Sequence, residues 1–511
     1  MGASVLCKPG RVCNKWTFGR GEMLITPQAY KERLSKLRPK VYIGGQKVQD
    51  ILDHPVTKTL VEANAKVYEL ALDPQYEEIM TTTSPLIGEK INRSLNLCQN
   101  NHDLEMRAAM AVLTSQKLGT CNYRCPGCDV LNGLASTTWE IDKERRTEYH
   151  RRLKEFVSYL QKNDLAVSGG VTDAKGDRSK RPLDQDPDMY VHVVERRSDG
   201  IVVRGAKQHQ SGAYVSDWTV VMPTMAYHKG EEDYAVAFAV PNGAEGISYI
   251  CQYNAYSAER MQAQDIHELG NPVYGQRETS LIILDNVFIP WERVFMCGEV
   301  DFTQRAVARF AKMHRMNCGG ACKVGFADLI IGATRLMAEY LGVERAAHVV
   351  DKLTEMVRIS ETSHACAIAA ALKGREEPEG SGIYLPDDIY SNVAKLNTCY
   401  GFWDIMALAG DIAGGFVVTM PSERDLKNPE IKDYLEKYVK GKAPAEKRMR
   451  IARFLQNWVA GLHGVATWQG AGSAQAQKLT LYRLFDFEGR KNLAQELAGL
   501  EVNDGGKVNQ S

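Results

Sequence analysis

The most specific chemical signal in the sequence is a run of three closely spaced cysteines, Cys121, Cys125 and Cys128. Cysteines four apart lie on the same face of a helical turn, so the first two thiolates could reach one inorganic centre. The neighbouring Arg124 would favour thiolate over thiol. A zinc site is a weaker alternative, because the second Cys-x2-Cys pair that it needs is missing. The alternative to a metal site is that the three cysteines are simply buried, but such clustering is uncommon for structural cysteines.

A second cluster is predicted at the start of a helix in the C-terminal region. It combines His314 with Cys318 and Cys322, and two glycines, Gly319 and Gly320, stand between the cysteines. Soft thiolates beside one imidazole suit an iron–sulfur cluster or zinc. Each glycine inside a helix costs about 1 kcal/mol relative to alanine. We therefore expect a bulge or a close backbone approach at a working site here.

Three softer patterns could contact a cofactor. His209, Gln210 and Ser211 form a polar turn after a strand, suited to a planar cofactor, with an ordinary hairpin as an equally good alternative. The small-residue stretches 410–415 and 469–475 permit close packing of helices or expose N–H groups to a phosphate, and close packing is the commoner reason. On the residues alone, histidines such as His209 and His463 are predicted to be structural.

Composition narrows the function classes. Lys and Arg together number 63, as do Asp and Glu, so the formal net charge is zero. A nucleic-acid-binding protein would concentrate basic charge, so no nucleic-acid partner is expected. No apolar run reaches the roughly 18 to 20 residues that cross a bilayer, and the apolar core of a signal peptide is missing. We expect a cytoplasmic protein without a membrane anchor, in which the twelve cysteines serve metal binding or chemistry rather than disulfides.

The periodicity along the chain changes twice. Thr26 as N-cap and Pro27 at the first helical position open a mainly helical region. Near Ala166 the character changes, and the paired glycines at 169–170, with further glycines and prolines up to Pro187, predict a loop-rich passage. Short alternating or β-branched runs follow it, and the helical period returns from Phe302. We predict four parts: an extension at residues 1–22, a helical N-terminal domain at 23–165, a β middle domain at 166–300 and a C-terminal helical bundle at 301–511.

The individual elements predict an α+β fold. Turn residues separate the short runs, as expected for an antiparallel sheet or small barrel; these runs are 190–194, 200–203, 217–222, 234–240, 247–252 and 280–287. Long helices are expected at 323–340, 346–372 and 447–465, with a surface loop at 374–384. Helices, then strands, then helices contradict a βαβ repeat. Neither a G-x-G-x-x-G turn after a strand nor a complete Walker A motif is present.

Seven further segments identify a known family: 53–55, 73–76, 80–88, 172–178, 202–207, 285–290 and 411–423. From about Met23 to the C-terminus, the chain resembles the flavoprotein family of 4-hydroxyphenylacetate 3-hydroxylases and 4-hydroxybutyryl-CoA dehydratases. The resemblance implies an acyl-CoA dehydrogenase-like fold, with a helical N-terminal domain, a β-barrel-like middle domain and a C-terminal helix bundle. It also implies a homotetramer, a dimer of dimers, that acts on an acyl-CoA.

The dehydratase members of the family imply two cofactors, FAD and a [4Fe–4S] cluster. By resemblance, the cluster ligands are Cys121, Cys125, His314 and Cys322, and Cys128 is not a ligand. Radical S-adenosylmethionine enzymes share the cysteine spacing, but they resemble βα barrels and usually carry an aromatic residue where Gly127 stands. The flavin-contacting positions implied here are His209, Gln210, Ser211, Asp411, Gly414, Gly415 and Gln475.

The reaction implied is dehydration of 4-hydroxybutyryl-CoA to crotonyl-CoA, with possible vinylacetyl-CoA isomerase activity. A weakly acidic hydrogen must leave C3, which the family achieves through transient one-electron oxidation by the flavin after a base has taken the C2 proton. Iron acts as Lewis acid on the departing hydroxyl. The catalytic residues implied are His314, Lys323 and Glu278. The alternatives are a divergent paralogue acting on another acyl-CoA and a flavin-dependent aromatic monooxygenase.

The sequence also departs from the family pattern. Seven residues separate His314 from Cys322, one more than in the family, and one extra residue turns a helical side chain about 100° away. A bulge at 319–321 is therefore required, or Cys318 takes the ligand position instead. Cys318 itself stands where the family has a functional tyrosine. Two family glutamates align with Ala466 and Thr279, although Glu278 is adjacent to the second.

Overall fold

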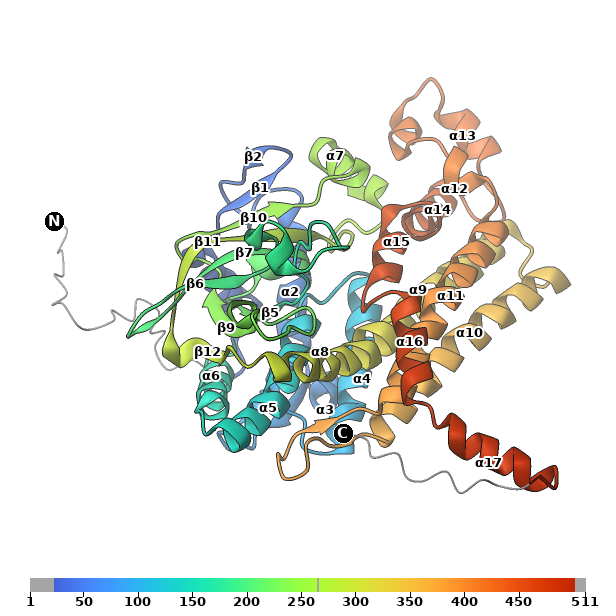
Figure 1. The fold of residues 1–511 in the computed structure, drawn as a ribbon. Helices are drawn as coiled ribbons and strands as arrows, with labels where there is room; N and C mark the ends of the chain where they lie inside the picture. The colour runs from blue at the N-terminus through green and yellow to red at the C-terminus, as the bar shows by residue number, and fades with distance from the viewer. Residues whose placement is uncertain (1–22, 264–265, 501–511) are drawn as a thin grey trace, which may run out of the picture. The chain divides into compact units, whose positions relative to one another are not determined.

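The computed structural model describes residues 23–263 and 266–500, which form two compact units (Figure 1). Unit 1 comprises residues 23–99, 113–310 and 376–383, and unit 2 comprises residues 100–112, 311–375 and 384–500. The predicted β middle domain and most of the predicted helical N-terminal domain fall within unit 1, whereas residues 100–112 belong to unit 2. The separation of the two predicted domains stays a prediction. The predicted extension at 1–22 lies outside the described residues.

Two open sheets form the centre of unit 1. The six-stranded sheet has the order β2-β1-β10-β11-β7-β6, and the four-stranded sheet has the order β12-β9-β8-β5. Neighbouring strands are antiparallel except for the pairs β1–β10 and β5–β8. The bounds are β1 Val41–Ile43, β2 Gln46–Lys47, β5 Val167–Gly170, β6 His192–Arg196, β7 Gly200–Ser211, β8 Trp218–Val221, β9 Val236–Pro241, β10 Ile247–Cys251, β11 Thr279–Pro290 and β12 Val294–Cys297. The mixed α and β composition is confirmed, but the barrel-like form is wrong, since neither of the described sheets closes on itself.

The six predicted strand regions all contain strands, whereas β5 was expected to be loop because of its paired glycines. The strand is fully buried and runs parallel to β8. Its glycines serve a close approach to α5 (Cys125–Arg145). A Cβ on Gly169 would lie 2.7 Å from the carbonyl oxygen of Pro126, and a Cβ on Gly127 would lie 2.1 Å from that of Val167. The first turn of α5, which carries Cys125, is therefore packed directly against the β5 backbone.

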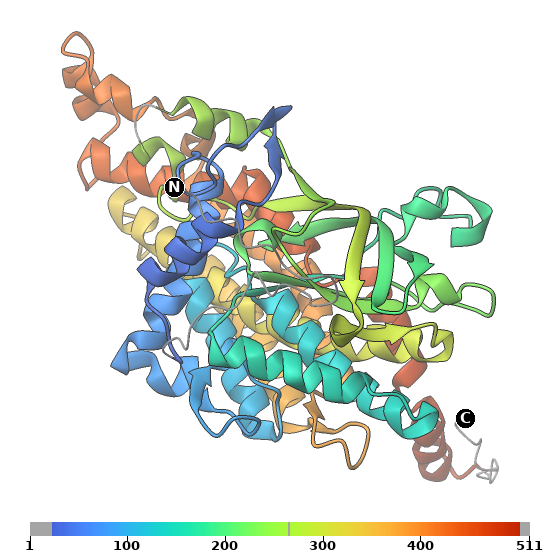
Figure 2. The same ribbon diagram turned by 90° about the vertical axis from the view of Figure 1, so that its left-hand side faces the viewer.

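The helices of unit 1 frame these sheets. They are α1 Pro27–Leu37, α2 Thr57–Leu72, α3 Glu77–Met80, α5, α6 Tyr149–Lys162 and α7 Ala255–Gln262, with a short ribbon of β3 Thr81–Thr83 and β4 Lys90–Asn92. Thr26 caps α1 as predicted, because its side chain accepts a hydrogen bond of 3.2 Å from the N–H of Ala29. Figure 2 shows α5 and α6 along the strands. Phe156 of α6 packs edge-on against Trp218 with ring centroids 5.2 Å apart, and it also contacts Phe295.

Unit 2 is a helical bundle around one apolar core. Its helices are α9 Cys322–Leu341, α10 Ala347–Leu372, α11 Asp388–Ala413, α12 Phe416–Thr419, α13 Lys432–Tyr438, α14 Ala445–Val459, α15 Leu462–Gln469, α16 Ala474–Leu484 and α17 Phe487–Leu497. Buried side chains of α9, α10, α11 and α14, such as Phe326, Met356, Phe402 and Trp458, make up the core. Within the expected surface loop, β13 Arg375–Glu376 and β14 Tyr384–Leu385 form a short ribbon.

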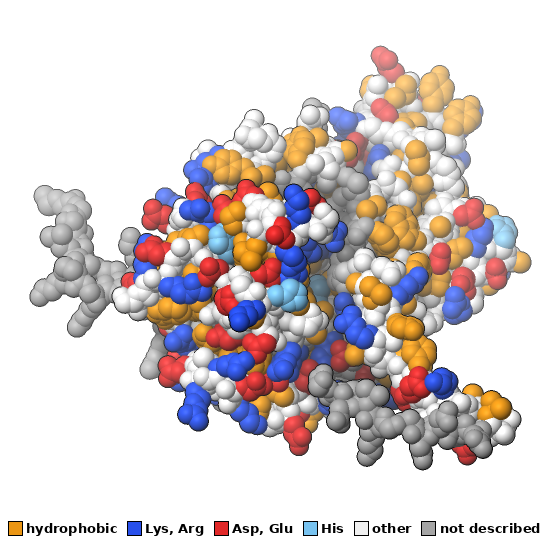
Figure 3. Space-filling model, in the orientation of Figure 1, with side chains coloured by type: hydrophobic (Ala, Val, Ile, Leu, Met, Phe, Trp, Pro, Cys, Tyr) orange, Lys and Arg blue, Asp and Glu red, His pale blue; other side chains and the backbone are white. Residues whose placement is uncertain are grey.

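Two of the three predicted C-terminal helices are confirmed almost to the residue, as α9 and α10. The third, at 447–465, is wrong as a single helix, because α14 ends at Val459 and α15 begins at Leu462. Among the described residues, no helix combines the length and the apolar character needed to cross a membrane. Basic and acidic side chains are intermixed on the face of unit 1 that Figure 3 shows, in line with their equal numbers in the sequence.

Candidate active site

The cysteine loop of unit 1 lies between α4 (Asn101–Leu118) and α5, and only Cys125 of the predicted ligand pair is helical. The expectation that both cysteines share one helical turn is wrong. The side chain of Asn122 caps the helix, since its Oδ1 accepts hydrogen bonds from the N–H groups of Arg124 (3.1 Å) and Cys125 (3.2 Å) and from the Cys125 thiol (3.1 Å). Helix α5 therefore starts at Cys125, and Cys121 stays in the loop.

The other two residues of this motif have different partners. The buried Cys128 thiol donates a hydrogen bond to the carbonyl oxygen of Ser94. The guanidinium of Arg124 donates to Oδ1 of Asn64 at 2.6 Å and lies over the ring of Tyr68, 3.7 Å from its centroid. Arg124 thus anchors the loop to α2, a role that the sequence did not indicate.

The polar turn predicted to contact flavin ends strand β7. Gln210 and Ser211 are buried and pair with Ser280 and Thr279 of β11, while His209 is exposed with a backbone φ of +58°. The chain then leaves through the 3-10 turn η5 (Ala213–Val215) and enters the other sheet. The alternative of an ordinary hairpin is therefore wrong.

Positive charge surrounds this turn. Partial burial lowers the pKa of His209, and the charges of Arg277 and Lys175 lower it further. Nε of Arg277 also donates a hydrogen bond of 3.2 Å to Oγ of Ser211. Cations beside a polar turn would suit the phosphates of a dinucleotide cofactor.

A buried ion pair fixes the strand just before the turn. Nζ of Lys207 lies 2.8 Å from Oδ1 of Asp173, and both side chains are almost fully buried. The N–H of Gln208 also donates to the carbonyl oxygen of Thr172 at 2.7 Å. Together these contacts hold the family-like segment at 172–178 alongside β7.

Glu278 lies just before β11 and is 2% exposed. Burial raises the pKa of its carboxyl to about 8, against the opposing effects of a hydrogen bond with Gln252 and the charge of Arg260. Its Oε2 has no hydrogen-bond partner within 23–263 and 266–500. The adjacent Thr279, where the family acid aligns, instead donates its hydroxyl to Gln252 at 2.8 Å. Glu278 is therefore a carboxyl group that stays protonated near neutral pH.

The remaining predicted flavin residues belong to unit 2. Asp411 is exposed and paired with Lys352, and Gln475 is exposed in the first turn of α16. Gly414 ends α11 with φ +70°, a conformation that favours glycine. A Cβ on Gly414 or Gly415 would meet nothing within 4 Å. Close helix packing, the commoner reason for such glycines, does not explain these two.

The second predicted ligand pair flanks an irregular helical segment of unit 2. His314 ends α8 (Val300–His314), Cys322 begins α9, and the intervening segment η9 (Arg315–Ala321) is π-helical. A π-helical turn holds more residues than an α-helical turn, so it takes up an inserted residue without breaking the helix. The predicted irregularity is confirmed, and it extends over seven residues rather than three.

The two glycines allow η9 to pack closely against α10 and α11. A Cβ on Gly319 would lie 2.9 Å from the Cβ of Lys395, and one on Gly320 would lie 3.1 Å from those of Ala367 and Ala394. The Thr398 hydroxyl donates to the carbonyl oxygen of Gly319 at 2.7 Å. This bond satisfies a carbonyl that the irregular turn exposes.

Four of the predicted chemical groups gather on this segment. A hydrogen bond with Cys322, the charge of Lys323 and a hydrogen bond with His314 hold the pKa of the buried Cys318 thiol well below its ordinary value. Nζ of Lys323 lies 3.5 Å from Sγ of Cys318. The segment therefore presents two soft sulfur donors, one imidazole and one ammonium group.

Lys395 is a functional candidate that the sequence analysis missed. It is fully buried on α11, and its Nζ donates to the carbonyl oxygen of Trp468 at 2.9 Å. Burial and the charge of Lys323 lower its pKa to about 8. A lysine within the apolar run 393–396 was the available signal. A narrow cavity nearby is lined by Lys323, Thr398 and apolar side chains that include Phe402.

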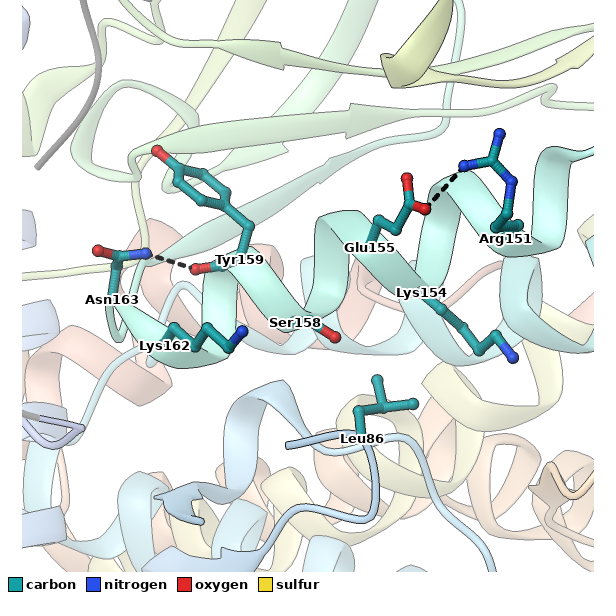
Figure 4. Close-up of a pocket in the computed structure, with 8 residues that line it drawn as sticks. All are labelled: Leu86, Arg151, Lys154, Glu155, Ser158, Tyr159, Lys162 and Asn163. Carbon is teal, nitrogen blue, oxygen red and sulfur yellow. Dashed lines mark hydrogen bonds and ion pairs between the residues drawn. The ribbon is translucent and has the colours of Figure 1, made fainter. Parts of the chain in front are cut away.

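A surface hollow of about 640 Å³ involves none of the predicted site residues. It lies over α6 in unit 1, and Figure 4 shows its lining of Arg151, Lys154, Glu155, Ser158, Tyr159, Lys162, Asn163 and Leu86. Nη1 of Arg151 contacts Oε1 of Glu155 at 2.7 Å across it.

The described residues contain no group of three or more His, Cys, Asp or Glu side chains arranged to hold a single metal ion. A [4Fe–4S] cluster distributes its ligands over four irons, so its donors need not converge on one point. The donors of the two predicted pairs, three thiols and one imidazole, fit such a cluster chemically. Cys121 and Cys125 belong to unit 1, and His314 and Cys322 belong to unit 2.

Comparisons with known proteins cover nearly the whole chain. A curated relative from Clostridium aminobutyricum, 4-hydroxybutyryl-CoA dehydratase/vinylacetyl-CoA-Δ-isomerase, is 43% identical over 94% of this chain and 100% of its own length. The oxygenase component of 4-hydroxyphenylacetate 3-monooxygenase from Thermus thermophilus is 28% identical over 91% of this chain and 95% of its own.

Solved structures that resemble this chain come from the same two kinds of enzyme. An oxygen-tolerant archaeal 4-hydroxybutyryl-CoA dehydratase from N. maritimus matches with a TM-score of 0.90 and 39% identity, over 94% of this chain and 95% of its own. The oxygenase component HpaB complexed with FAD matches with a TM-score of 0.80 and 25% identity, over 93% and 98%. Family models for the N-terminal and C-terminal parts of 4-hydroxyphenylacetate 3-hydroxylase match residues 26–296 and 303–499. The chain therefore belongs to the family of 4-hydroxyphenylacetate 3-hydroxylases and 4-hydroxybutyryl-CoA dehydratases.

Proposed function

We propose that the protein is a hydro-lyase that converts 4-hydroxybutyryl-CoA to crotonyl-CoA with FAD and a [4Fe–4S] cluster, and that it also isomerises vinylacetyl-CoA. The observation that carries this proposal is the thiol-rich π-helical segment η9 with its flanking His314 and Cys322. Flavin-dependent hydroxylation of an aromatic ring does not require buried soft metal ligands in this segment. The relative from Clostridium aminobutyricum and the archaeal neighbour bear the dehydratase name.

We assign the cluster ligands as Cys121, Cys125, His314 and Cys322. The bound cluster would supply a Lewis-acidic iron for the departing hydroxyl. The 3.5 Å contact between Lys323 and Cys318 supports Cys322, rather than Cys318, as the fourth ligand. In this arrangement the Lys323 ammonium group pairs with the Cys318 thiol.

We assign flavin contacts to His209, Gln210 and Ser211, together with Asp411, Gly414, Gly415 and Gln475. The bound flavin would supply a reversible electron acceptor. The cations around the His209 turn support phosphate binding there, and the open surroundings of Gly414 and Gly415 support exposure to a ligand. The HpaB structure, with which this chain shares its fold, contains FAD.

The reaction balance sets what the side chains must do. Conversion of a 4-hydroxyacyl thioester to crotonyl-CoA removes one hydrogen from C2 and one from C3. One of these protons returns to C4, and the other leaves with the hydroxyl as water. At least two proton carriers are therefore needed. We assign these roles to His314, as the base for the C2 proton, and to Glu278, whose carboxyl stays protonated at neutral pH. Lys323 would stabilise negative charge that develops on the thioester oxygen.

We also propose that the chain assembles as a homotetramer. Helices α16 and α17 expose apolar side chains, among them Tyr482 (75% exposed) and Leu497 (91% exposed). Leu493, Phe485 and Phe487 are also exposed, and the ring of Phe487 contacts those of Tyr482 and Phe485. Exposed apolar side chains that gather in this way typically mark a protein interface. A second copy of the chain is the partner that the family implies.

The proposed reaction is tested with protein purified anaerobically. We expect brown protein with bound FAD and about four irons per chain, and crotonyl-CoA formation from 4-hydroxybutyryl-CoA. Full cluster and flavin without this conversion would refute the dehydratase assignment in favour of another acyl-CoA substrate. Yellow protein without iron that hydroxylates phenols would instead indicate a monooxygenase.

The ligand assignment is tested by comparing Cys322→Ser with Cys318→Ser. We expect Cys322→Ser to lose most of its iron, because a ligand to the cluster is removed, while Cys318→Ser keeps it. Iron and acid-labile sulfide per chain are measured after identical anaerobic purification. The reverse pattern would make Cys318 the ligand.

Glu278 gives a pH-dependent prediction. Its folded pKa of about 8 exceeds the ordinary value of 4.5, so the folded state loses stability relative to the unfolded state as pH rises from about 4.5 to about 8. The melting temperature of the wild type should therefore fall relative to that of Glu278→Gln as pH rises through this window. Above the window the difference between the two melting temperatures should stay constant. Turnover should fall by about 10²–10⁴-fold.

The exposed Glu292 supplies the control for this test. Glu292→Gln should change neither the pH dependence of melting nor turnover. A constant difference between Glu278→Gln and the wild type from pH 5 to pH 9 would show that the Glu278 carboxyl is not protonated in the folded protein.

The tetramer is tested with Leu493→Glu combined with Leu497→Glu. Burying two carboxylates in the proposed interface should shift the assembly to smaller species in light scattering coupled to gel filtration. Leu183→Glu, at a similarly exposed leucine of unit 1, should leave the mass unchanged. An unaltered tetramer in the double variant would place the interface elsewhere.

A further inference from the structure

Tyr123, between the two cysteines of the unit 1 loop, has an unusual combination of backbone and side-chain environment. Its backbone φ is +59°, although its side chain is completely buried. A bulky residue rarely adopts this left-handed conformation, and surrounding contacts must hold it there. Strained residues of this kind concentrate where a precise local geometry is needed.

The loop on either side of Tyr123 is anchored. Nδ2 of Asn122 donates to Oγ1 of Thr114 at 3.0 Å, and Arg124 bonds to Asn64. The N–H of Tyr123 itself points to Sγ of Cys121 at 3.4 Å. A hydrogen bond of this type tunes a thiolate that binds metal. The strained backbone therefore aims one donor at the proposed ligand.

The side chain of Tyr123 meets the proposed flavin turn. Gly212 directly follows Ser211, and a Cβ on Gly212 would lie only 2.4 Å from the Cβ of Tyr123 and 2.9 Å from its carbonyl oxygen. The close approach requires glycine at this position, and φ of Gly212 is also positive, at +70°. The cysteine loop and the end of β7 are thus in direct contact.

The phenol of Tyr123 meets the segment that carries Glu278. Its hydroxyl donates to the carbonyl oxygen of Gln276 at 3.3 Å and accepts from the N–H of Glu278 at 3.3 Å. The hydroxyl therefore bridges two backbone groups of this segment, as donor to one and acceptor from the other.

We propose that Tyr123 is a positioning residue that couples the cysteine loop to both the flavin turn and Glu278. It fixes the Cys121 thiol, the end of β7 and the Glu278 backbone relative to one another through one rigid ring. The roles of the three partners rest on the proposed function, whereas the coupling rests on the contacts of Tyr123. The phenol touches neither a reacting atom nor a cofactor in this account.

The test compares Tyr123→Phe with Tyr249→Phe. Tyr249 is also completely buried in unit 1, and its hydroxyl hydrogen-bonds to Asn242 at 2.8 Å and 3.3 Å rather than to the segment that carries Glu278. Both variants lose one buried phenol hydroxyl, so a comparable fall in melting temperature is expected. The control therefore subtracts the general cost of that loss.

The distinguishing readouts are flavin affinity, the visible flavin spectrum and the pH profile of turnover. We expect Tyr123→Phe to weaken FAD binding roughly fivefold, the scale of one lost hydrogen bond, to shift the flavin absorption bands and to move the pH profile. Tyr249→Phe should change none of these. Gly212→Ala adds a Cβ that would clash with Tyr123 at the same contact, so it should also weaken FAD binding.

The outcomes separate this proposal from the proposed function. Equal flavin affinity, spectrum and pH profile in the two tyrosine variants would overturn the positioning role. If the wild type formed no crotonyl-CoA but Tyr123→Phe alone weakened FAD, the positioning role would stand and the dehydratase assignment would fall.

Discussion

The helix that joins His314 to Cys322 has to accommodate an inserted residue while remaining packed in a helical bundle. The π-helical segment at 315–321 meets this constraint, because a wider turn absorbs a residue without ending the helix. A wider turn also exposes backbone and needs room. Gly319 and Gly320 supply the room against α10 and α11, and the Thr398 hydroxyl satisfies a carbonyl. The pairing of Cys318 with Lys323, and the role of Cys322 as an iron ligand in our proposal, both depend on this turn.

In unit 1 the backbone that carries the predicted ligands is also held in an irregular conformation, but by other contacts. Its cysteine loop is fixed by capping, anchoring and close backbone contact rather than by a widened helix. Asn122 decides where α5 begins, and Gly127 and Gly169 let its first turn press against β5. Tyr123 then connects the loop to Glu278. In both units, small residues allow an unfavourable backbone to be held by its neighbours, and the stabilisation comes from packing rather than from local preference.

Much of the fold was predictable because long periodic segments report burial directly. The helices at 322–341 and 347–372 and the six strand regions follow from spacing alone. Strand β5 was not predictable, since Gly169 and Gly170 read as loop until the helix that packs on them is known. For the site, the inserted residue between His314 and Cys322 predicted an irregular turn, and the structure has one. The positions of Cys121 and Arg124 were misjudged, because a capping side chain and a partner on α2 override local spacing. Tyr123 lies inside the cysteine motif and Lys395 inside an apolar run, but the importance of both comes from partners distant in the sequence.

The central claim is that one imidazole and three thiols of this chain share a single iron–sulfur cluster. Pulsed electron paramagnetic resonance of the one-electron-reduced protein tests it most directly, because the method detects nitrogen bound to a paramagnetic cluster. We expect a [4Fe–4S] signal with a histidine nitrogen coupling that disappears in His314→Cys, while the cluster itself remains. A cluster signal without nitrogen coupling in the wild type, or a coupling that survives in His314→Cys, would contradict it.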